Sequence, residues 1–384
     1  MVKKRSRAGG AAQNSQSPSV VDSVPQPLQS DESRVAQSSG ANSRSKCWGL
    51  AGLSLTVIAA VIAALLLSAG DESFPPEQPP KSAADVSTLQ KRRLTSRAVV
   101  FGFLPDYRFD SADLEFIIPR VTHLCLFGSE ADPKTGAPII KLPSSDRLDV
   151  AKRVAKQSGT KLLLGFGGAG RSDFFAPVLN NAQLHGRFRK DLVAAMKKEQ
   201  LDGIEMNWMY PSTSHDVGSL KRFVSDIKAD LPGILVTMSL PPDRQFARAI
   251  VPAGFDLLHI MVYQGGVARS DSLSFAKTMM TSIIKEAGDP GKLTLGLPFY
   301  GSMIKSGEVV SYEEIFTRHE GDFALARFED SAHLLSKIAL AEELRIAGVA
   351  IWEVGQDCRP RAVGSHAQTC PKGPSDSLLG AISA

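Results

Sequence analysis

Polar and polarisable side chains alternate along one short apolar stretch, residues 201–211, which reads LDGIEMNWMYP. The apolar start and the closing Pro211 predict a buried strand that emerges into a loop. Successive side chains of a strand point to opposite faces, so one face is expected to hold Gly203, Glu205, Asn207 and Met209. An unpaired polar group in an apolar setting costs roughly 2–7 kcal/mol. Two such groups in line therefore predict the lining of a site.

This stretch resembles the fourth-strand signature of the glycoside hydrolase family 18 chitinases, D-G-x-D-x-D-x-E-Y-P. Four of its residues fit the signature, namely Asp202, Gly203, Tyr210 and Pro211. The departures fall on the chemistry of the family. Glu205 and Asn207 stand where the family has two aspartates, and Met209 stands where it has the catalytic glutamate.

The resemblance implies substrate-assisted cleavage, an exception to the usual two-carboxylate scheme. In that family the acetamido oxygen of the sugar attacks the anomeric carbon, the glutamate protonates the leaving oxygen, and an aspartate two residues earlier orients the acetamido group. The thioether of Met209 has no proton to transfer, whereas the amide of Asn207 still forms hydrogen bonds. Glu205 is expected on the same face, roughly 13 Å deeper in the barrel than Met209, as a buried structural carboxyl. The sequence thus predicts no intact catalytic residue.

Other stretches carry the same resemblance. Residues 161–168 (KLLLGFGG), 296–301 (GLPFYG) and 348–357 (GVAIWEVGQD) are similar to the third, seventh and eighth strands of the family. Met261 and Tyr263 match its sixth-strand M-x-Y-D, in which Gln264 replaces the aspartate. Trp352 aligns with the tryptophan that floors the sugar subsite, and plain core packing is its alternative role. The implied ligand-binding set is Asn207, Met209, Tyr210, Met261, Tyr263, Gln264 and Trp352.

Eight apolar runs alternate with amphipathic stretches from Val99 onward. The runs span 99–104, 121–127, 161–168, 201–211, 235–240, 257–264, 293–301 and 348–356. Helical spacing of apolar residues recurs in two of the intervening stretches, from Leu184 to Met196 and from Leu220 to Ile227. Such alternation predicts a parallel sheet covered by helices, and eight units predict an α/β fold of the (β/α)8 TIM barrel type over 97–384. A doubly wound open sheet is the rival, but no Gly-rich phosphate fingerprint follows the first run.

The N-terminal 46 residues are poor in apolar side chains, which predicts a disordered tail over 1–46. They hold seven basic and three acidic residues, an excess equal to the formal net charge of +4 for the whole chain. The remainder is therefore balanced, and its charge does not predict a nucleic-acid partner for the barrel.

Residues 47–70 form an uncharged run long enough to cross a bilayer as a helix. Arg44 and Lys46 precede the run, and Asp71 and Glu72 follow it, so the positive-inside rule predicts a single-pass type II membrane protein with a cytosolic tail. A buried core helix is the alternative. The Pro-rich segment 71–96 is expected to be an extended stalk that places the barrel in a lumen or outside the cell.

The cysteines and histidines predict structural roles. Cys358 and Cys370 are expected to form a disulfide, since a bond closing a loop of this size stabilises a non-cytosolic domain by roughly 3 kcal/mol. Cys125 is expected to be a buried thiol, and His123 and His259 to be core histidines. No cluster of ligands has metal-site spacing, so neither a metal nor another cofactor is predicted.

The leading hypothesis is a membrane-anchored chitinase-like protein that binds glycans containing N-acetylglucosamine without efficient hydrolysis. Two alternatives stay open: an active glycosidase with a displaced acid such as Glu130, and a protein-binding scaffold without a sugar ligand. Only a short segment separates Gly301 from Gly348. The α+β insertion that many family members carry there is thus expected to be reduced or absent.

Overall fold

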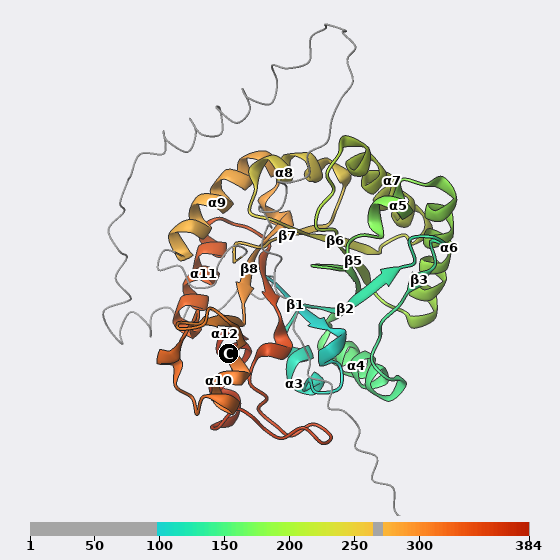
Figure 1. Ribbon diagram of the computed structural model, residues 1–384. Helices are drawn as coiled ribbons and strands as arrows, with labels where there is room; N and C mark the ends of the chain where they lie inside the picture. The colour runs from blue at the N-terminus through green and yellow to red at the C-terminus, as the bar shows by residue number, and fades with distance from the viewer. Residues whose placement is uncertain (1–97, 264–271, 384) are drawn as a thin grey trace, which may run out of the picture. The chain divides into compact units, whose positions relative to one another are not determined.

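Eight parallel strands close into a barrel in the computed structural model, which describes residues 98–263 and 272–383 (Figure 1). The strands run in the spatial order β1-β12-β8-β7-β6-β5-β4-β2, and β1 also pairs with β2. This closing pair excludes the open doubly wound sheet and confirms the predicted barrel. The strands are β1 (Val99–Pro105), β2 (His123–Ala131), β4 (Lys161–Gly167), β5 (Gly203–Asn207), β6 (Leu235–Leu240), β7 (Leu257–Ile260), β8 (Leu293–Pro298) and β12 (Gly348–Trp352).

Helices surround the barrel because each strand is followed by an amphipathic stretch (Figure 1). The two predicted helical stretches are α6 and α7, and each begins at a capping side chain. Asn181 accepts the Gln183 and Leu184 amides of α6, and Thr213 forms a capping box with Asp216 in α7. The helices are α3 (Leu114–Ile117), α4 (Ser145–Ser158), α5 (Phe175–Leu179), α6 (Ala182–Glu199), α7 (Ser214–Asp230), α8 (Arg244–Ile250), α9 (Ser272–Ala287), α11 (Ser331–Glu343) and α12 (Leu378–Ser383).

The apolar core forms two layers, since alternate residues of each strand face inward and outward. On β5, Ile204 and Met206 face outward and join the large cluster between barrel and helices. Trp208, just past the strand, belongs to the same cluster and stacks on Phe175. A separate cluster fills the interior and consists of Phe101, Phe103, Cys125, Phe127, Leu163, Leu257 and Ala350. The predicted alternation is therefore confirmed over Gly203–Asn207, while Met209 lies beyond the end of the strand, and Cys125 is a buried free thiol.

The chain forms a small second sheet in the segment that connects β8 to β12. It contains β9 (Tyr300–Met303), β10 (Val309–Ser311) and β11 (Ala326–Arg327), with α10 (Tyr312–Arg318) and the 3-10 turn Phe323–Leu325 packed beside them. An insertion is thus present between β8 and β12, as a three-stranded sheet with one α-helix, where the sequence predicted a reduced or absent one. Its first strand begins two residues after β8 ends, so the insertion stands at the C-terminal end of the barrel.

Several predicted features lie outside the described residues. These are the tail over 1–46, the membrane-spanning run over 47–70, the stalk over 71–96 and Gln264. Over residues 98–263 and 272–383, the helices are all too short or too polar to cross a bilayer.

Candidate functional site

Parallel strands of a barrel present their C-terminal ends at a single mouth, where barrel enzymes hold their chemistry. Trp352 is the last residue of β12 and is partly exposed at this end. Its ring packs on Phe103 and Phe127 of β1 and β2, with ring centroids 5.4 and 5.3 Å apart. The indole therefore closes the top of the interior cluster and leaves part of its surface free for a ligand.

Asn207 and Met209 lie at the end of β5. The Asn207 side chain is only 1% exposed, and its Oδ1 atom has no hydrogen-bond partner among the described residues. Met209 follows the strand and is partly exposed, with its amide donating to Ser172 Oγ at 3.0 Å. A buried amide oxygen without a partner is a costly feature that a ligand N–H would relieve.

Tyr263 follows β7 and brings a phenol toward the same end of the barrel. Its ring lies edge-on to Tyr300 at 6.1 Å, and a Cβ at Gly296 would come within 2.6 Å of it, so β8 needs a glycine there. Removal from water raises the pKa of the Tyr263 phenol well above its ordinary value. The neutral hydroxyl is thus a donor and an acceptor. Met261 is buried beside it.

Tyr210 is partly exposed after β5 and packs edge-on against Phe246 of α8, with ring centroids 5.4 Å apart. This contact anchors the loop that carries Met209. The structure thus places the predicted set at the ends of β5, β7 and β12, with Gln264 alone outside the described residues.

Glu205 lies one inward-facing position deeper than Asn207 and is fully buried. Its carboxyl accepts hydrogen bonds from the hydroxyls of Thr237 and Ser239 on β6. Burial raises the pKa of this carboxyl to about 7, because a low dielectric disfavours the charged form. Glu205 therefore fits the expected structural role. Its two partners were not predicted, but a sequence signal for them exists, since Thr237 and Ser239 alternate with apolar residues in LVTMSL.

His259 faces Glu205 across the interior. Its Nδ1 atom pairs with Thr294 Oγ1 at 2.7 Å, while Nε2 lies 3.6 Å from a Glu205 oxygen and forms no hydrogen bond within the described residues. Burial lowers the His259 pKa to about 3, so this imidazole is neutral. His259 is thus a core histidine as expected, but only one of its two ring nitrogens has a hydrogen-bond partner within the described residues.

Charged side chains form ion pairs beside the mouth, and one of them is Glu130, the candidate for a displaced acid. Glu130 near the end of β2 lies 3.8 Å from Arg171 Nε, and Arg171 also pairs with Asp106 at 3.2 Å. Glu353, directly after Trp352, is fully buried and bound by Arg108 Nε at 3.1 Å. Both carboxylates near the platform are therefore engaged by arginines.

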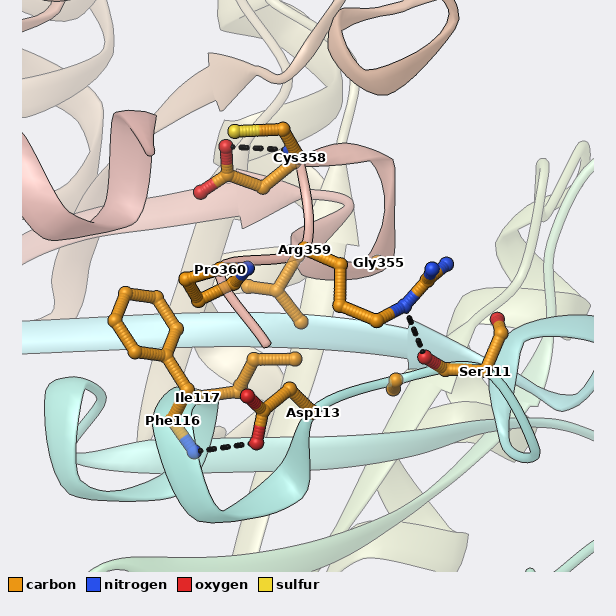
Figure 2. A pocket seen from close by; sticks show the side chains of 11 residues that line it. Ser111, Asp113, Phe116, Ile117, Gly355, Cys358, Arg359 and Pro360 are labelled. Atoms are coloured by element: carbon orange, nitrogen blue, oxygen red, sulfur yellow. Dashed lines mark hydrogen bonds between the residues drawn. The ribbon is translucent and has the colours of Figure 1, made fainter. Parts of the chain in front are cut away.

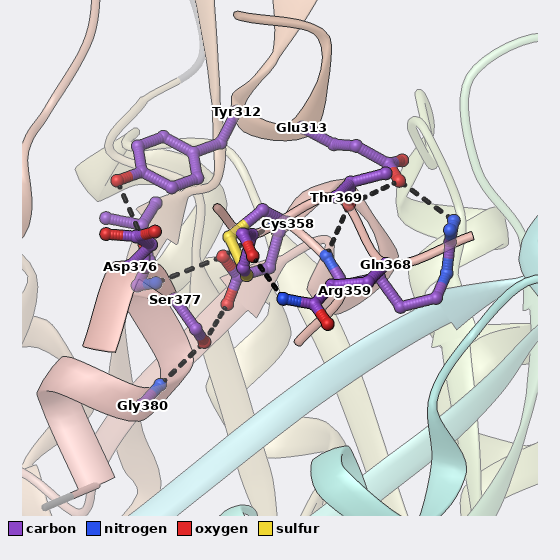
Figure 3. Close-up of a disulfide and its surroundings, with 12 residues drawn as sticks. Tyr312, Glu313, Cys358, Arg359, Gln368, Thr369, Asp376, Ser377 and Gly380 are labelled. Carbon is purple, nitrogen blue, oxygen red and sulfur yellow. Dashed lines mark hydrogen bonds and ion pairs between the residues drawn. A yellow bond between two sulfur atoms is a disulfide. The ribbon is translucent and has the colours of Figure 1, made fainter. Parts of the chain in front are cut away.

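The C-terminal segment is closed into a loop by the Cys358–Cys370 disulfide, and residues beside the disulfide tie the segment to the barrel (Figure 3). Asp357 accepts from the Ser377 hydroxyl and from the amides that open α12. Arg359 reaches the Ser111 carbonyl at 2.7 Å and Glu313 of α10 at 2.8 Å (Figures 2 and 3). The segment thus joins the insertion to the loop after β1.

Two pockets lie away from the candidate site. The one in Figure 2, beside Arg359 and Cys358, has a volume of about 20 Å³, which suits a single water and no sugar. A pocket of about 630 Å³ lies at the opposite, N-terminal ends of β4 to β6, where Lys161, Asp202 and Leu235 line it. In barrel proteins that end contributes to stability, so neither pocket belongs to the predicted site.

Comparison with known proteins points to one family. A sequence model described as Glycosyl hydrolases family 18 matches residues 140–357. The chain is 21% identical over 285 residues to "Probable chitinase 2" of Drosophila melanogaster, which covers 55% of this chain and 59% of that protein. The chain therefore matches less than two thirds of that relative's length.

Solved structures resemble the barrel. A chitinase from Bacteroides thetaiotaomicron has a TM-score of 0.61 at 18% identity, covering 75% of this chain and 96% of its own. A mutant GH18 chitinase from Cycas revoluta in complex with (GlcNAc)4 has a TM-score of 0.57 at 20% identity, covering 67% of this chain and 96% of its own. At these identities the likeness establishes the fold alone.

Proposed function

Because the chain belongs to glycoside hydrolase family 18, we propose that its barrel binds glycans built from N-acetylglucosamine and does not cleave them efficiently. The carrying observation is the end of β5, where Met209 stands at the place of the family's acid while Asn207 Oδ1 is buried without a partner among the described residues. An amide oxygen can accept the acetamido N–H of a sugar, but a thioether cannot protonate a leaving group.

The platform supports binding through stacking. Aromatic faces pack against the apolar faces of ligands, and Trp352 is partly exposed at the strand ends beside the inner cluster. The phenol of Tyr263 adds a neutral donor for the acetamido oxygen. This combination of an indole face, an amide acceptor and a phenol suits an uncharged N-acetylated sugar.

A displaced acid is less well supported. Glu130 is paired with Arg171, and Glu353 is bound by Arg108 and by the Gly355 amide. Glu353 is fully buried, so a ligand cannot reach its carboxyl, whereas Glu130 lies 3.8 Å from Arg171 and keeps 39% of its side chain exposed. Glu205 is enclosed in the barrel and bonded to Thr237 and Ser239. These contacts favour binding over hydrolysis.

Titration calorimetry of the full-length chain with chitotetraose, the tetramer of N-acetylglucosamine, tests the platform. Trp352→Ala should abolish measurable binding, Trp352→Phe should retain part of it because an aromatic face remains, and Met209→Ala should retain most of it. Circular dichroism serves as the folding control. A folded Trp352→Ala variant that binds as tightly as the parent would refute the platform, and a parent that binds none of a broad glycan panel would favour the scaffold alternative.

We also propose that the protein is anchored in a membrane in type II orientation. The support is the uncharged run 47–70 between basic residues on its N-terminal side and acidic residues on the other. In sealed membranes, protease added to the cytosolic side should remove an epitope tag placed after Val2 and spare one placed after Ala384. Protection of the N-terminal tag with loss of the C-terminal one would contradict this orientation.

A further inference from the structure

Ser172, in the loop after β4, fastens that loop to the end of β5. Its hydroxyl is buried at 7% exposure and accepts the Met209 amide at 3.0 Å. The same oxygen lies 2.9 Å from the Gly168 carbonyl and 3.2 Å from the Asn207 carbonyl. A hydroxyl has one proton, so it donates to one of these carbonyls at a time while it accepts from Met209.

Arg171, the preceding residue, extends the connection to two more strands. Its Nη1 atom donates to both carboxylate oxygens of Asp106, directly after β1, at 3.2 Å, and to the Gly128 carbonyl of β2 at 2.9 Å. Gly128 has a φ of +126°, and a Cβ there would lie 2.8 Å from Arg171. Two consecutive residues thus connect the C-terminal ends of β1, β2, β4 and β5.

This connection fixes Asn207 through its backbone. The Asn207 carbonyl accepts the Gly168 amide at 2.8 Å as well as facing Ser172, whereas its side-chain Oδ1 keeps no partner within the described residues. The side-chain acceptor is therefore held in place without being used. Its alignment with a ligand N–H depends on where the loop after β4 holds the strand end, since hydrogen bonds weaken outside 2.7–3.2 Å.

We propose that Arg171 and Ser172 are positioning residues that set the preference of this site for N-acetylated over de-N-acetylated glucosamine units, acting through Asn207 and Met209. The inference rests on the proposed glycan binding. A tightly held, dry strand end rewards a neutral acetamido group and penalises the ammonium of a free amine, whose burial beside the neutral Asn207 is not compensated. A loosened strand end admits water, which misaligns the amide acceptor and relieves the penalty on the ammonium.

Titration calorimetry measures the dissociation constants of the full-length chain for chitotetraose and for its fully de-N-acetylated counterpart. The preference for N-acetylated units is the ratio of the second constant to the first. Ser172→Ala should lower the ratio of the two constants about fivefold or more, as expected from one lost hydrogen bond. Ser172→Thr keeps the hydroxyl and should stay within about twofold of the parent. Ser158→Ala removes a hydroxyl of α4 that bonds to Val154 and Thr160, and should leave the ratio unchanged.

The ratio distinguishes a positioning role of Ser172 from a purely structural one, because a purely structural role would weaken the binding of both ligands equally. An unchanged ratio in folded Ser172→Ala would overturn the inference. If that variant does not fold, Arg171→Gln replaces it: a reduced ratio supports the inference and an unchanged one overturns it. If the parent binds neither oligomer, the proposed function fails and the inference with it. If the parent prefers the N-acetylated oligomer and no variant shifts the ratio, the inference alone fails.

Discussion

In the alignment that we propose for the end of β5, Met209 and Asn207 are neutral residues at the positions of the family's acid and aspartate. Met209→Glu restores a carboxyl to the acid's place, yet Asn207 still supplies no negative charge to steady the developing oxazolinium. We expect Met209→Glu alone to cleave chitotetraose weakly or not at all, and Met209→Glu with Asn207→Asp to cleave it faster. General acid assistance is typically worth about 10²–10⁴-fold.

Product analysis by mass spectrometry on the full-length chain measures this. Met209→Gln, which introduces a polar side chain without an acid, is the matched control. It should give no cleavage products, either alone or combined with Asn207→Asp. Cleavage by Met209→Glu as fast as by the double variant would show that the charge at position 207 is immaterial.

Glu205 makes stability depend on pH. Its folded pKa of about 7 lies above the ordinary value of 4.5, so the folded state keeps a proton that the unfolded state releases between these values. The contribution of Glu205 to stability should therefore fall as pH rises from about 4.5 to about 7 and level off above. The loss amounts to roughly 3 kcal/mol at about 1.4 kcal/mol per pKa unit. The facing His259 is neutral in the folded state throughout this window but binds a proton on unfolding below its ordinary pKa of 6.5, so its contribution to stability has the opposite sign.

Urea denaturation of the parent and of Glu205→Gln at pH 5 and pH 8 tests this sign. The variant cannot ionise, so its stability relative to the parent should improve from pH 5 to pH 8. An identical difference in unfolding free energy at the two pH values would mean that Glu205 does not carry a raised pKa.

At the scale of elements, the C-terminal loop is closed by the Cys358–Cys370 disulfide and held by Asp357 and Arg359 (Figure 3). The bond joins residues 12 apart, and a loop of that size restricts the unfolded chain by roughly 3 kcal/mol. Replacing both cysteines by serine should lower the unfolding free energy by up to that amount. The parent with its disulfide reduced is the control, because reduction opens the same loop without a substitution. Equal stability of parent and double variant would contradict the entropic role.

The barrel was predictable from sequence because each strand is a near-continuous apolar run, the pattern of a sheet buried on both faces. The ends of the strands were harder to predict. The run 257–264 ends as strand at Ile260, and 293–301 splits into β8 and β9. The alternation that placed Glu205, Asn207 and Met209 is local, which is why it could be read from sequence. The pairings of Ser172 with Met209 and of Arg171 with Asp106 join separate strands, so no local pattern reports them.

At the scale of the whole molecule, the described residues that stabilise the barrel are different from those that we propose to bind the ligand. The interior cluster and Glu205 lie inside the barrel, while Trp352, Tyr263 and Asn207 lie at or just past the strand ends, where barrel proteins bind ligands. The insertion after β8 adds a sheet of three short strands to this end. The site is built mainly from the strand ends themselves, which makes its ligand contacts testable one residue at a time.

The central claim is binding without cleavage, and a single sample can test both halves. The full-length chain is titrated with chitotetraose in a calorimeter, and the cell contents are then analysed by mass spectrometry after prolonged incubation. We predict a saturable heat of binding, with the tetramer recovered intact. Shorter oligomers in the parent sample that persist in Met209→Ala would show that an acid elsewhere in the chain cleaves the glycan, and the absence of any binding heat would contradict the glycan ligand itself.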